Sequence, residues 1–336
     1  YLGAAYQRKE DHLNAIEAFN YTIYIQDDFV KAYINKADSL SELGYYQNAI
    51  DCCLDSAKYR EPNAALFYDI GDYYEKLDNL EKAKSYFHKS IKKDENFDES
   101  WFALALIIDL QGQHIEASYH LKKAIDINPT NVDYLFSYAQ IHEKVGFIKE
   151  AEIAYRKVLE LDEFDSETWL NYSHLLFQYE SYSEAIDLLK KAIKINPKNV
   201  DARYNKSLLL LNLESFKKGW LAYEYRWKKS KLDSVPTLSS RPKWHLGDQG
   251  RVLVWGEQGI GDEIMFSSLI PDLHAACSHL IVKADKRLIP ILSRSFPKDI
   301  EFVENSVPVA EDDYDAHIAM GSLPLHFRPN IESFKI

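Results

Sequence analysis

The stretch RVLVWGEQGIGDEIMF, residues 251–266, holds the residues whose types and spacing are best suited to chemistry. Its β-branched and aromatic start predicts a buried strand, and the apolar segment after the glycine-rich loop predicts a helix. Free backbone N–H groups at such a helix start attract polar or anionic groups, so we expect Glu257, Gly259 and Gly261 to contact a substrate. Asp262 could act as a general base towards a hydroxyl group. Its alternative role is a helix cap, for which aspartate is favoured.

A dinucleotide site is a second interpretation of this loop. Asp285 closes the next predicted strand, about where an acid could bind a ribose. The third glycine of the dinucleotide fingerprint is missing, however, because Ile264 occupies its place. No cofactor is therefore predicted. The three cysteines show no zinc-ligand spacing, so no metal site is predicted either.

A second set of candidate residues recurs at multiples of 34 residues and consists of asparagines: Asn35, Asn171 and Asn205. An amide side chain both donates and accepts hydrogen bonds, so a row of amides can hold a peptide main chain regardless of its sequence. Asp69, Ala103 and Ser137 occupy the intervening positions and interrupt the row. The alternative is that these asparagines lie solvated on an exposed helix face.

The elements that carry these asparagines repeat every 34 residues. Small residues recur at Ala15, Ala49, Ala83, Ala117, Ala151, Ala185 and Gly219, and bulky or apolar residues recur four positions later, from Phe19 to Tyr223. Gly44, Gly112 and Gly146 share one turn position. About seven consecutive units predict stacked pairs of helices whose small residues lie where the two helices cross.

This register resembles the tetratricopeptide repeat family over residues 1–229. The resemblance implies an α-solenoid with a concave groove, lined by the first helix of each unit, that binds a polypeptide or a partner protein. The asparagines resemble the peptide-holding ladder in the tetratricopeptide domain of O-linked N-acetylglucosamine transferases. The first unit starts at its sixth position, so we expect the given sequence to begin inside a helix.

Composition changes after residue 229, where prolines and glycines become frequent. Residues 230–250 are predicted to form a connector held down by Trp244. Residues 251–336 alternate between strand and helix: strands are predicted at 251–256, 279–285, 300–305 and 315–320, with helices at 262–277 and 286–296. This order predicts a small parallel, doubly wound α/β layer of Rossmann type.

The order of motifs also resembles bacterial repeat proteins that carry a heptosyltransferase-like glycosyltransferase domain of GT-B architecture. The resemblance rests on Gly261, Asp262 and Pro271, on YEYRW at 223–227 and on MGSLP at 320–324. It implies an inverting protein glycosyltransferase in which Asp262 deprotonates the acceptor. The donor, a nucleotide sugar, would be bound chiefly by a second α/β domain. The given sequence ends at Ile336, so we expect it to be a fragment without activity of its own. The alternative is a non-catalytic scaffold for protein–protein interaction.

The net charge and the hydropathy of the sequence exclude some classes of binding partner. The formal net charge of −12 argues against general nucleic-acid binding. The longest apolar run, 101–108, is too short to span a membrane. Unpaired cysteines suggest a cytoplasmic protein, and the oligomeric state is not predicted.

An aromatic cluster lies at the end of the last repeat and consists of Trp220, Tyr223, Tyr225 and Trp227. We expect it to dock the last unit on the α/β layer rather than to bind a ligand.

Overall fold

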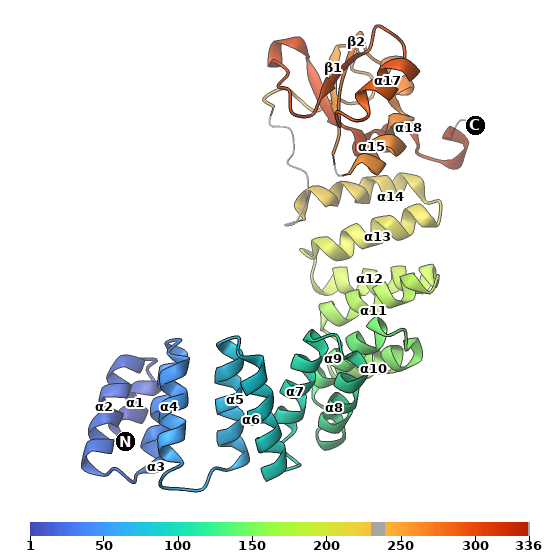
Figure 1. Cartoon of the computed structure of the whole chain (residues 1–336). Helices are drawn as coiled ribbons and strands as arrows, with labels where there is room; N and C mark the ends of the chain where they lie inside the picture. The colour runs from blue at the N-terminus through green and yellow to red at the C-terminus, as the bar shows by residue number, and fades with distance from the viewer. Residues whose placement is uncertain (230–238, 258, 335–336) are drawn as a thin grey trace. The chain divides into compact units, whose positions relative to one another are not determined.

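The computed structural model describes residues 1–229, 239–257 and 259–334 (Figure 1). They form two compact units, Tyr1–Glu163 and Phe164–Ile336. The first unit is made of helices, and the second combines helices with a small parallel sheet. Residues 230–238 of the predicted connector lie outside the described residues.

The first unit consists of five helix pairs in which successive helices contact one another. The helices are α1 Leu2–Gln7, α2 His12–Ile25, α3 Val30–Glu42, α4 Tyr46–Ser56, α5 Ala64–Lys76, α6 Leu80–Lys93, α7 Asp98–Leu110, α8 His114–Ile127, α9 Val132–Lys144 and α10 Ile148–Leu161. We call the first, odd-numbered helix of each pair helix A and the second helix B. Asn63 and Asn131 begin two of the A helices by accepting hydrogen bonds from backbone N–H groups of the first turn.

The 34-residue register predicted from the sequence is confirmed. The alanines of the small series, from Ala15 to Ala185, are completely buried. The bulky residues four positions later on the same B helices, among them Phe87, Leu121 and Tyr155, are completely buried as well. Close approach of helices A and B therefore excludes longer side chains at the small positions.

Every helix A ends in the same backbone geometry. A residue two positions after the helix end, or three in the case of α1, has a positive φ in each unit: Glu10, Gly44, Asp78, Gly112, Gly146, Glu180 and Glu214. In each case the next backbone N–H bonds to a carbonyl five residues back, as from Ser181 to Leu176 at 2.9 Å. This is the hydrogen bond of a Schellman motif, which favours glycine. The sequence identified the turn only where glycine occupies it.

The second unit begins with two further helix pairs of the same register. They are α11 Ser166–Gln178, α12 Tyr182–Ile195, α13 Val200–Asn212 and α14 Phe216–Tyr223, and a 3₁₀ turn, η1 Glu224–Lys228, follows directly. Ser173, Ser207 and Gly219 occupy the small positions and are buried.

A four-stranded parallel sheet completes the second unit. Its strands are β1 Arg251–Trp255, β2 His279–Ala284, β3 Glu301–Glu304 and β4 Ala316–Ala319, in the order β3-β2-β1-β4. The helices are α15 Ile260–Ser267, α16 Ile270–His274, α17 Ile289–Ser295 and α18 Leu323–Phe327. The predicted strands are confirmed, but the predicted single helix 262–277 is wrong. It is divided into α15 and α16 because Pro271 begins a new helix at that point.

The two faces of the sheet are covered differently. Val252 and Val254 point towards α15 and α16 and join a core with Phe266 and Leu273. Leu253 lies on the opposite face, where it packs with Ile281 and with Tyr314 from the segment before β4. Because side chains alternate along a strand, Trp255 and His317, which pairs with Leu253, share this opposite face.

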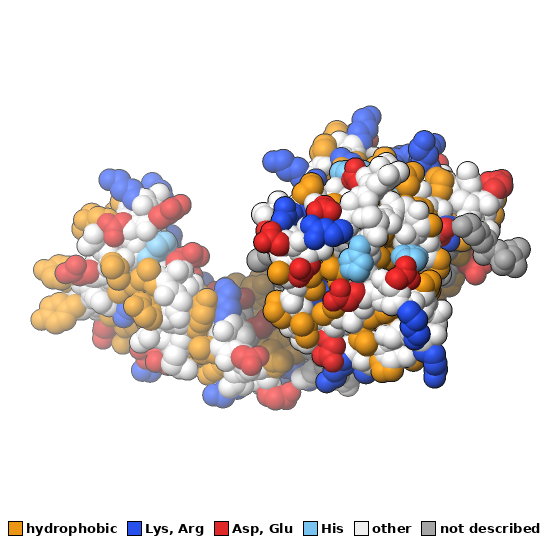
Figure 2. Space-filling view, turned by 90° about the horizontal axis from the view of Figure 1, so that it is seen from above, with side chains coloured by type: hydrophobic (Ala, Val, Ile, Leu, Met, Phe, Trp, Pro, Cys, Tyr) orange, Lys and Arg blue, Asp and Glu red, His pale blue; other side chains and the backbone are white. Residues whose placement is uncertain are grey.

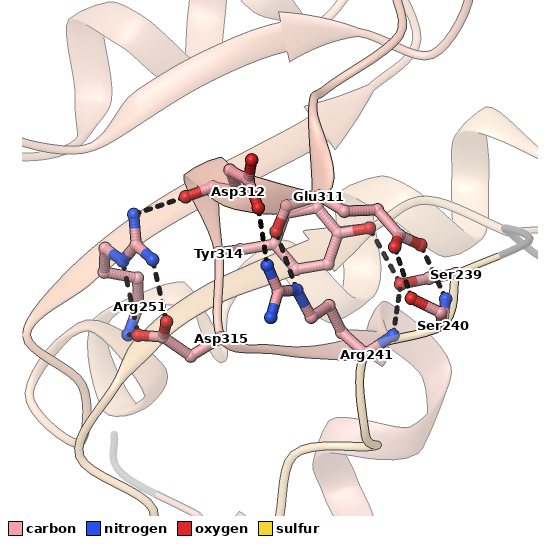
Figure 3. A network of polar contacts seen from close by, with 8 residues as sticks. All are labelled: Ser239, Ser240, Arg241, Arg251, Glu311, Asp312, Tyr314 and Asp315. Carbon is pink, nitrogen blue, oxygen red and sulfur yellow. Dashed lines mark hydrogen bonds and ion pairs between the residues drawn. The ribbon is translucent and has the colours of Figure 1, made fainter.

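The described end of the connector is fixed along the edge of the sheet (Figure 3). Lys243 forms a parallel bridge with His317, and Trp244, 1% exposed, donates its backbone N–H to the His317 carbonyl. Beside it, Arg241 bonds to Asp312 and Arg251 pairs with Asp315, as Figure 3 shows. The connector therefore pairs with an otherwise free strand edge.

Candidate functional site

The glycine-rich loop begins at the carboxyl end of β1, and its first glycine is required by a buried acid. A Cβ atom on Gly256 would collide with the carboxylate of Glu263, which is 4% exposed. Glu263 accepts hydrogen bonds from the Asp285 backbone N–H at 2.7 Å and from Asn305 Nδ2 at 2.9 Å. Burial raises the pKa of Glu263. This acid therefore ties together the segments that follow β1, β2 and β3.

Asp285 itself is engaged by a neighbour. Both of its carboxylate oxygens accept hydrogen bonds from Arg287, which lowers the pKa of Asp285. To bind a ribose, the Asp285 carboxylate would have to exchange these contacts with Arg287 for contacts with the ligand.

Gly259 and Gly261 have no such steric reason to be glycine. Nothing lies within 4 Å of a Cβ placed on either residue, and neither has a positive φ. Both are exposed at the start of α15, where free N–H groups point outward. Asp262 is partly exposed beside them, and its Oδ2 accepts the Gly259 N–H at 3.4 Å. The capping contact is long, and the role of Asp262 as a general base remains a prediction.

The sequence predicted that Glu257 contacts a substrate. In the structure, Glu257 instead forms a buried ion pair. Its carboxylate is 3.2 Å from Nε and 2.7 Å from Nη2 of Arg226. Arg226 is 1% exposed and Glu257 is 3% exposed. A Cβ on Gly321 would overlap Glu257 Oε1, so only glycine allows this approach.

Arg226 connects the last repeat to both loops at the centre of the sheet. Its Nη2 also donates to Ser322 Oγ at 2.8 Å, and its Nη1 donates to Glu224 at 2.7 Å. Glu257 and Glu224 raise the pKa of Arg226 despite its burial. In open parallel sheets, ligands bind where the strand order reverses, here between β1 and β4. Arg226 and its carboxylates fill that place. This role of Arg226 was not predicted from the sequence, although an arginine inside an aromatic cluster was a signal for it.

The aromatic cluster docks the last repeat, as predicted. Tyr223 is 6% exposed within the core that includes Val252 and Val254. The Trp220 ring meets Phe266 of α15 edge to face at 6.3 Å. Trp227 differs, because it contacts Trp255 at 5.5 Å and borders a pocket.

This pocket has a volume of 420 Å³ and lies beside the connector, on the side of the sheet that carries Trp255 and His317. Its wall is formed mainly by indole and imidazole rings. The aromatic lining residues are Trp227, Trp244, Trp255, His245, His317 and His326, and the polar ones include Glu224, Lys243 and Ser322. The volume lies within the usual range of small-molecule sites. We call it the tryptophan pocket.

The asparagines are partly exposed A-helix residues with unused amides. Among the described residues, the side-chain amides of Asn35, Asn171 and Asn205 have no hydrogen-bond partner. Asn205 lines a 180 Å³ pocket together with Phe177 of α11 and Leu208 of α13. Asn35 lies in the first compact unit, and Asn171 and Asn205 lie in the second.

Asp69, which interrupts the asparagine row in the first unit, has an unusual acidity. Burial, with Asp38 and Asp72 nearby, raises its pKa to about 7. The carboxylate therefore changes charge near neutral pH.

The described residues contain neither a metal-binding cluster nor a membrane-spanning helix. Within the described ranges, no three His, Cys, Asp or Glu side chains are grouped closely enough to hold a metal ion. None of the helices described here is long and apolar enough to span a membrane. Figure 2 shows basic and acidic side chains interspersed on the face of the C-terminal unit turned to the viewer.

Comparison with known proteins identifies the repeats. The tetratricopeptide repeat model matches residues 30–63, 64–97 and 132–165, and a TPR repeat model matches residues 174–213. The chain is similar to a solved TPR repeat-containing protein of Cytophaga hutchinsonii, with a TM-score of 0.59 and 15% identity, over 68% of this chain and 94% of that one.

Two curated relatives match parts of the chain. Protein FlbA of Caulobacter vibrioides is 30% identical over 39% of this chain and 25% of its own length. Human protein O-mannosyl-transferase TMTC3 is 23% identical over 56% of this chain and 21% of its own length. The chain thus spans about a quarter or less of each of these relatives. Together with the family models and the observed register, these matches show that the helical part of the chain contains tetratricopeptide repeats.

Proposed function

We propose that this protein binds an extended polypeptide on the A helices of its repeats. The proposal rests on two unpartnered amides: that of Asn205, which lines the 180 Å³ pocket, and that of Asn171 on α11, the helix that also supplies Phe177 to the pocket. Each amide can pair with a peptide N–H and a peptide carbonyl. The apolar part of the pocket, with Phe177 and Leu208, suits one side chain of the bound segment.

Binding to an unfolded chain tests this proposal. Carboxymethylated lactalbumin, which stays unfolded, serves as the probe in a fluorescence-anisotropy titration. We expect the double variant Asn171→Ala/Asn205→Ala to bind about tenfold more weakly, the equivalent of one or two lost hydrogen bonds. Asn212→Ala, at the exposed end of α13, is the matched control and should bind normally. Equal binding by the double variant would remove these amides from the contact.

We further propose that the α/β layer contributes to sugar transfer onto the bound polypeptide. The strand order β3-β2-β1-β4 supports this, because doubly wound nucleotide-binding sheets begin with strands in that arrangement. Exposed Gly259 and Gly261 leave room for a ligand beside Asp262. A relative that matches 56% of this chain is also named a protein O-mannosyl-transferase.

In this reaction Asp262 accepts the proton of an acceptor hydroxyl. The oxygen then forms a bond to the anomeric carbon of a nucleotide sugar, the bond to the nucleotide diphosphate breaks, and the configuration inverts. The test uses the protein as its gene encodes it, with radiolabelled nucleotide sugars and the same unfolded probe. Asp262→Asn should reduce transfer by at least about a hundredfold, whereas Asp313→Asn, an exposed change in the segment before β4, should not. Undiminished transfer by Asp262→Asn would exclude Asp262 as the base.

A further inference from the structure

The tryptophan pocket is built from three parts of the second unit that are distant in sequence. Trp227 comes from the 3₁₀ turn after the last repeat, Trp244 from the connector and Trp255 from the end of β1. Trp244 and Trp255 are almost completely buried, whereas Trp227 is partly exposed. The pocket therefore has a fixed floor and one accessible indole wall.

Two ring pairs of the pocket wall are steeply inclined and do not form parallel walls for a flat ligand. Trp255 and His317 lie at 29°, but a hydrogen bond joins their ring nitrogens. The Trp227 and Trp255 rings are inclined at 52° with centroids 5.5 Å apart. Trp244 and His326 meet at 80°. A flat heterocycle stacks best between nearly parallel rings, whereas a puckered ring offers C–H groups in several directions. The wall geometry thus favours a saturated ring.

The charges of the pocket favour a neutral ligand. Burial lowers the pKa of His317 and of His326, so both imidazoles are largely uncharged at neutral pH. The Arg226 guanidinium is already paired with Glu257 and Glu224. Lys243 is the remaining cation of the lining, and it is exposed. A diphosphate would therefore lack the cluster of cations that it needs.

Hydrogen-bonding groups remain available beside the aromatic wall. Oε2 of Glu224 and both ring nitrogens of His326 have no hydrogen-bond partner among the described residues. His317, in contrast, is fixed, because its Nδ1 accepts the Trp255 indole N–H at 3.2 Å. A carboxylate oxygen accepts from hydroxyl groups, and a neutral imidazole both donates and accepts.

We propose that the tryptophan pocket binds the pyranose ring of a carbohydrate, with its C–H face on Trp227 and its hydroxyls on Glu224 and His326. Asp262 is not part of the lining and belongs to α15, which covers the other face of the sheet. The pocket is therefore a recognition site and not a site of transfer. It does not depend on the proposed catalytic role of Asp262.

The test uses methyl glycosides of glucose, galactose, mannose and N-acetylglucosamine, with uridine as a flat probe and pyrophosphate as an anionic one. Binding is followed by indole fluorescence and saturation-transfer NMR. We expect at least one glycoside to bind with a Kd in the range of about 1–10 mM, as expected for a single small ring. Trp227→Ala should weaken binding about tenfold, which corresponds to about 1.4 kcal/mol.

Tyr225→Ala is the matched control, because Tyr225 lies on the same turn and also contacts a cation but is outside the pocket. It should leave the affinity unchanged. If Trp227→Ala lowers the melting temperature, His326→Gln provides the same comparison with a smaller structural change. The proposal is overturned if no glycoside binds the folded protein up to about 20 mM. It is also overturned if binding survives in folded Trp227→Ala and His326→Gln, or if uridine or pyrophosphate binds more tightly than every glycoside.

Discussion

The pairing of Gly71 with Phe87 allows a sharp test of how the repeats pack. Gly71 in α5 faces Phe87 in α6, and a Cβ atom at position 71 would lie 2.6 Å from Phe87 Cε1. Phe87 is completely buried, so its ring has no free space into which to move. The next unit has Ala105 and Leu121 at the same two positions. Glycine therefore accommodates the ring, whereas alanine suffices opposite leucine.

Two opposing effects decide the outcome of Gly71→Ala. Overpacking against the ring costs about 1–3 kcal/mol, and replacing a glycine within a helix gains about 1 kcal/mol. The substitution should therefore lower the free energy of unfolding by up to about 2 kcal/mol. In the Phe87→Leu background the overpacking disappears, so the same substitution should raise the free energy of unfolding by about 1 kcal/mol.

Urea unfolding followed by far-UV circular dichroism measures all four members of this double-mutant cycle. Ser85→Ala, an exposed change on α6, is the control and should have the same effect in both backgrounds. If Gly71→Ala stabilises the protein with Phe87 present, or changes stability equally in both backgrounds, steric exclusion does not explain the glycine.

Three further outcomes are expected. Arg226→Met should destabilise the second unit by about 3–5 kcal/mol in thermal melts, because it leaves buried Glu257 unpaired. The control is Arg251→Met, which removes the exposed ion pair between Arg251 and Asp315. An equal effect of the two substitutions would argue against a buried ion pair. Glu180→Gly should raise the free energy of unfolding by about 1 kcal/mol, because glycine relieves its φ of 59°; a loss of stability would contradict this. The raised pKa of Asp69 means that the folded state holds a proton more strongly than the unfolded state, so its contribution to stability falls as pH rises from about 4 to about 7. Free energies of unfolding from urea titrations should show Asp69→Asn gaining about 4 kcal/mol relative to the wild type over this range, and a constant difference would refute the assignment.

Much of the architecture follows from local patterns. The small and bulky residues repeat every 34 positions, and this spacing alone fixes which faces of the helices are buried. The strands of the sheet were predicted because their β-branched runs are long and bounded by turn residues. Pro271 was overlooked as a helix start, so one predicted helix became two. The positive φ values at Glu10, Asp78, Glu180 and Glu214 were missed because acidic residues give no local signal for them.

The candidate sites depend on contacts that no local pattern reveals. Glu257 and Gly259 are two positions apart, yet one is sealed against Arg226 and the other is open to solvent. The partner of Glu257 lies 31 residues earlier, in a segment that the sequence indicated only as an aromatic end of the repeats. The tryptophan pocket likewise joins three separate segments.

By itself, the sequence determined the repeat, its register, the parallel strands and the glycine-rich loop, because each depends on residues close together in the chain or on a fixed period. Only the tertiary structure decided which acids of that loop are buried, which ring faces remain accessible and where a ligand can enter. Burial and pairing are properties of what packs against a side chain, and those neighbours come from distant parts of the chain.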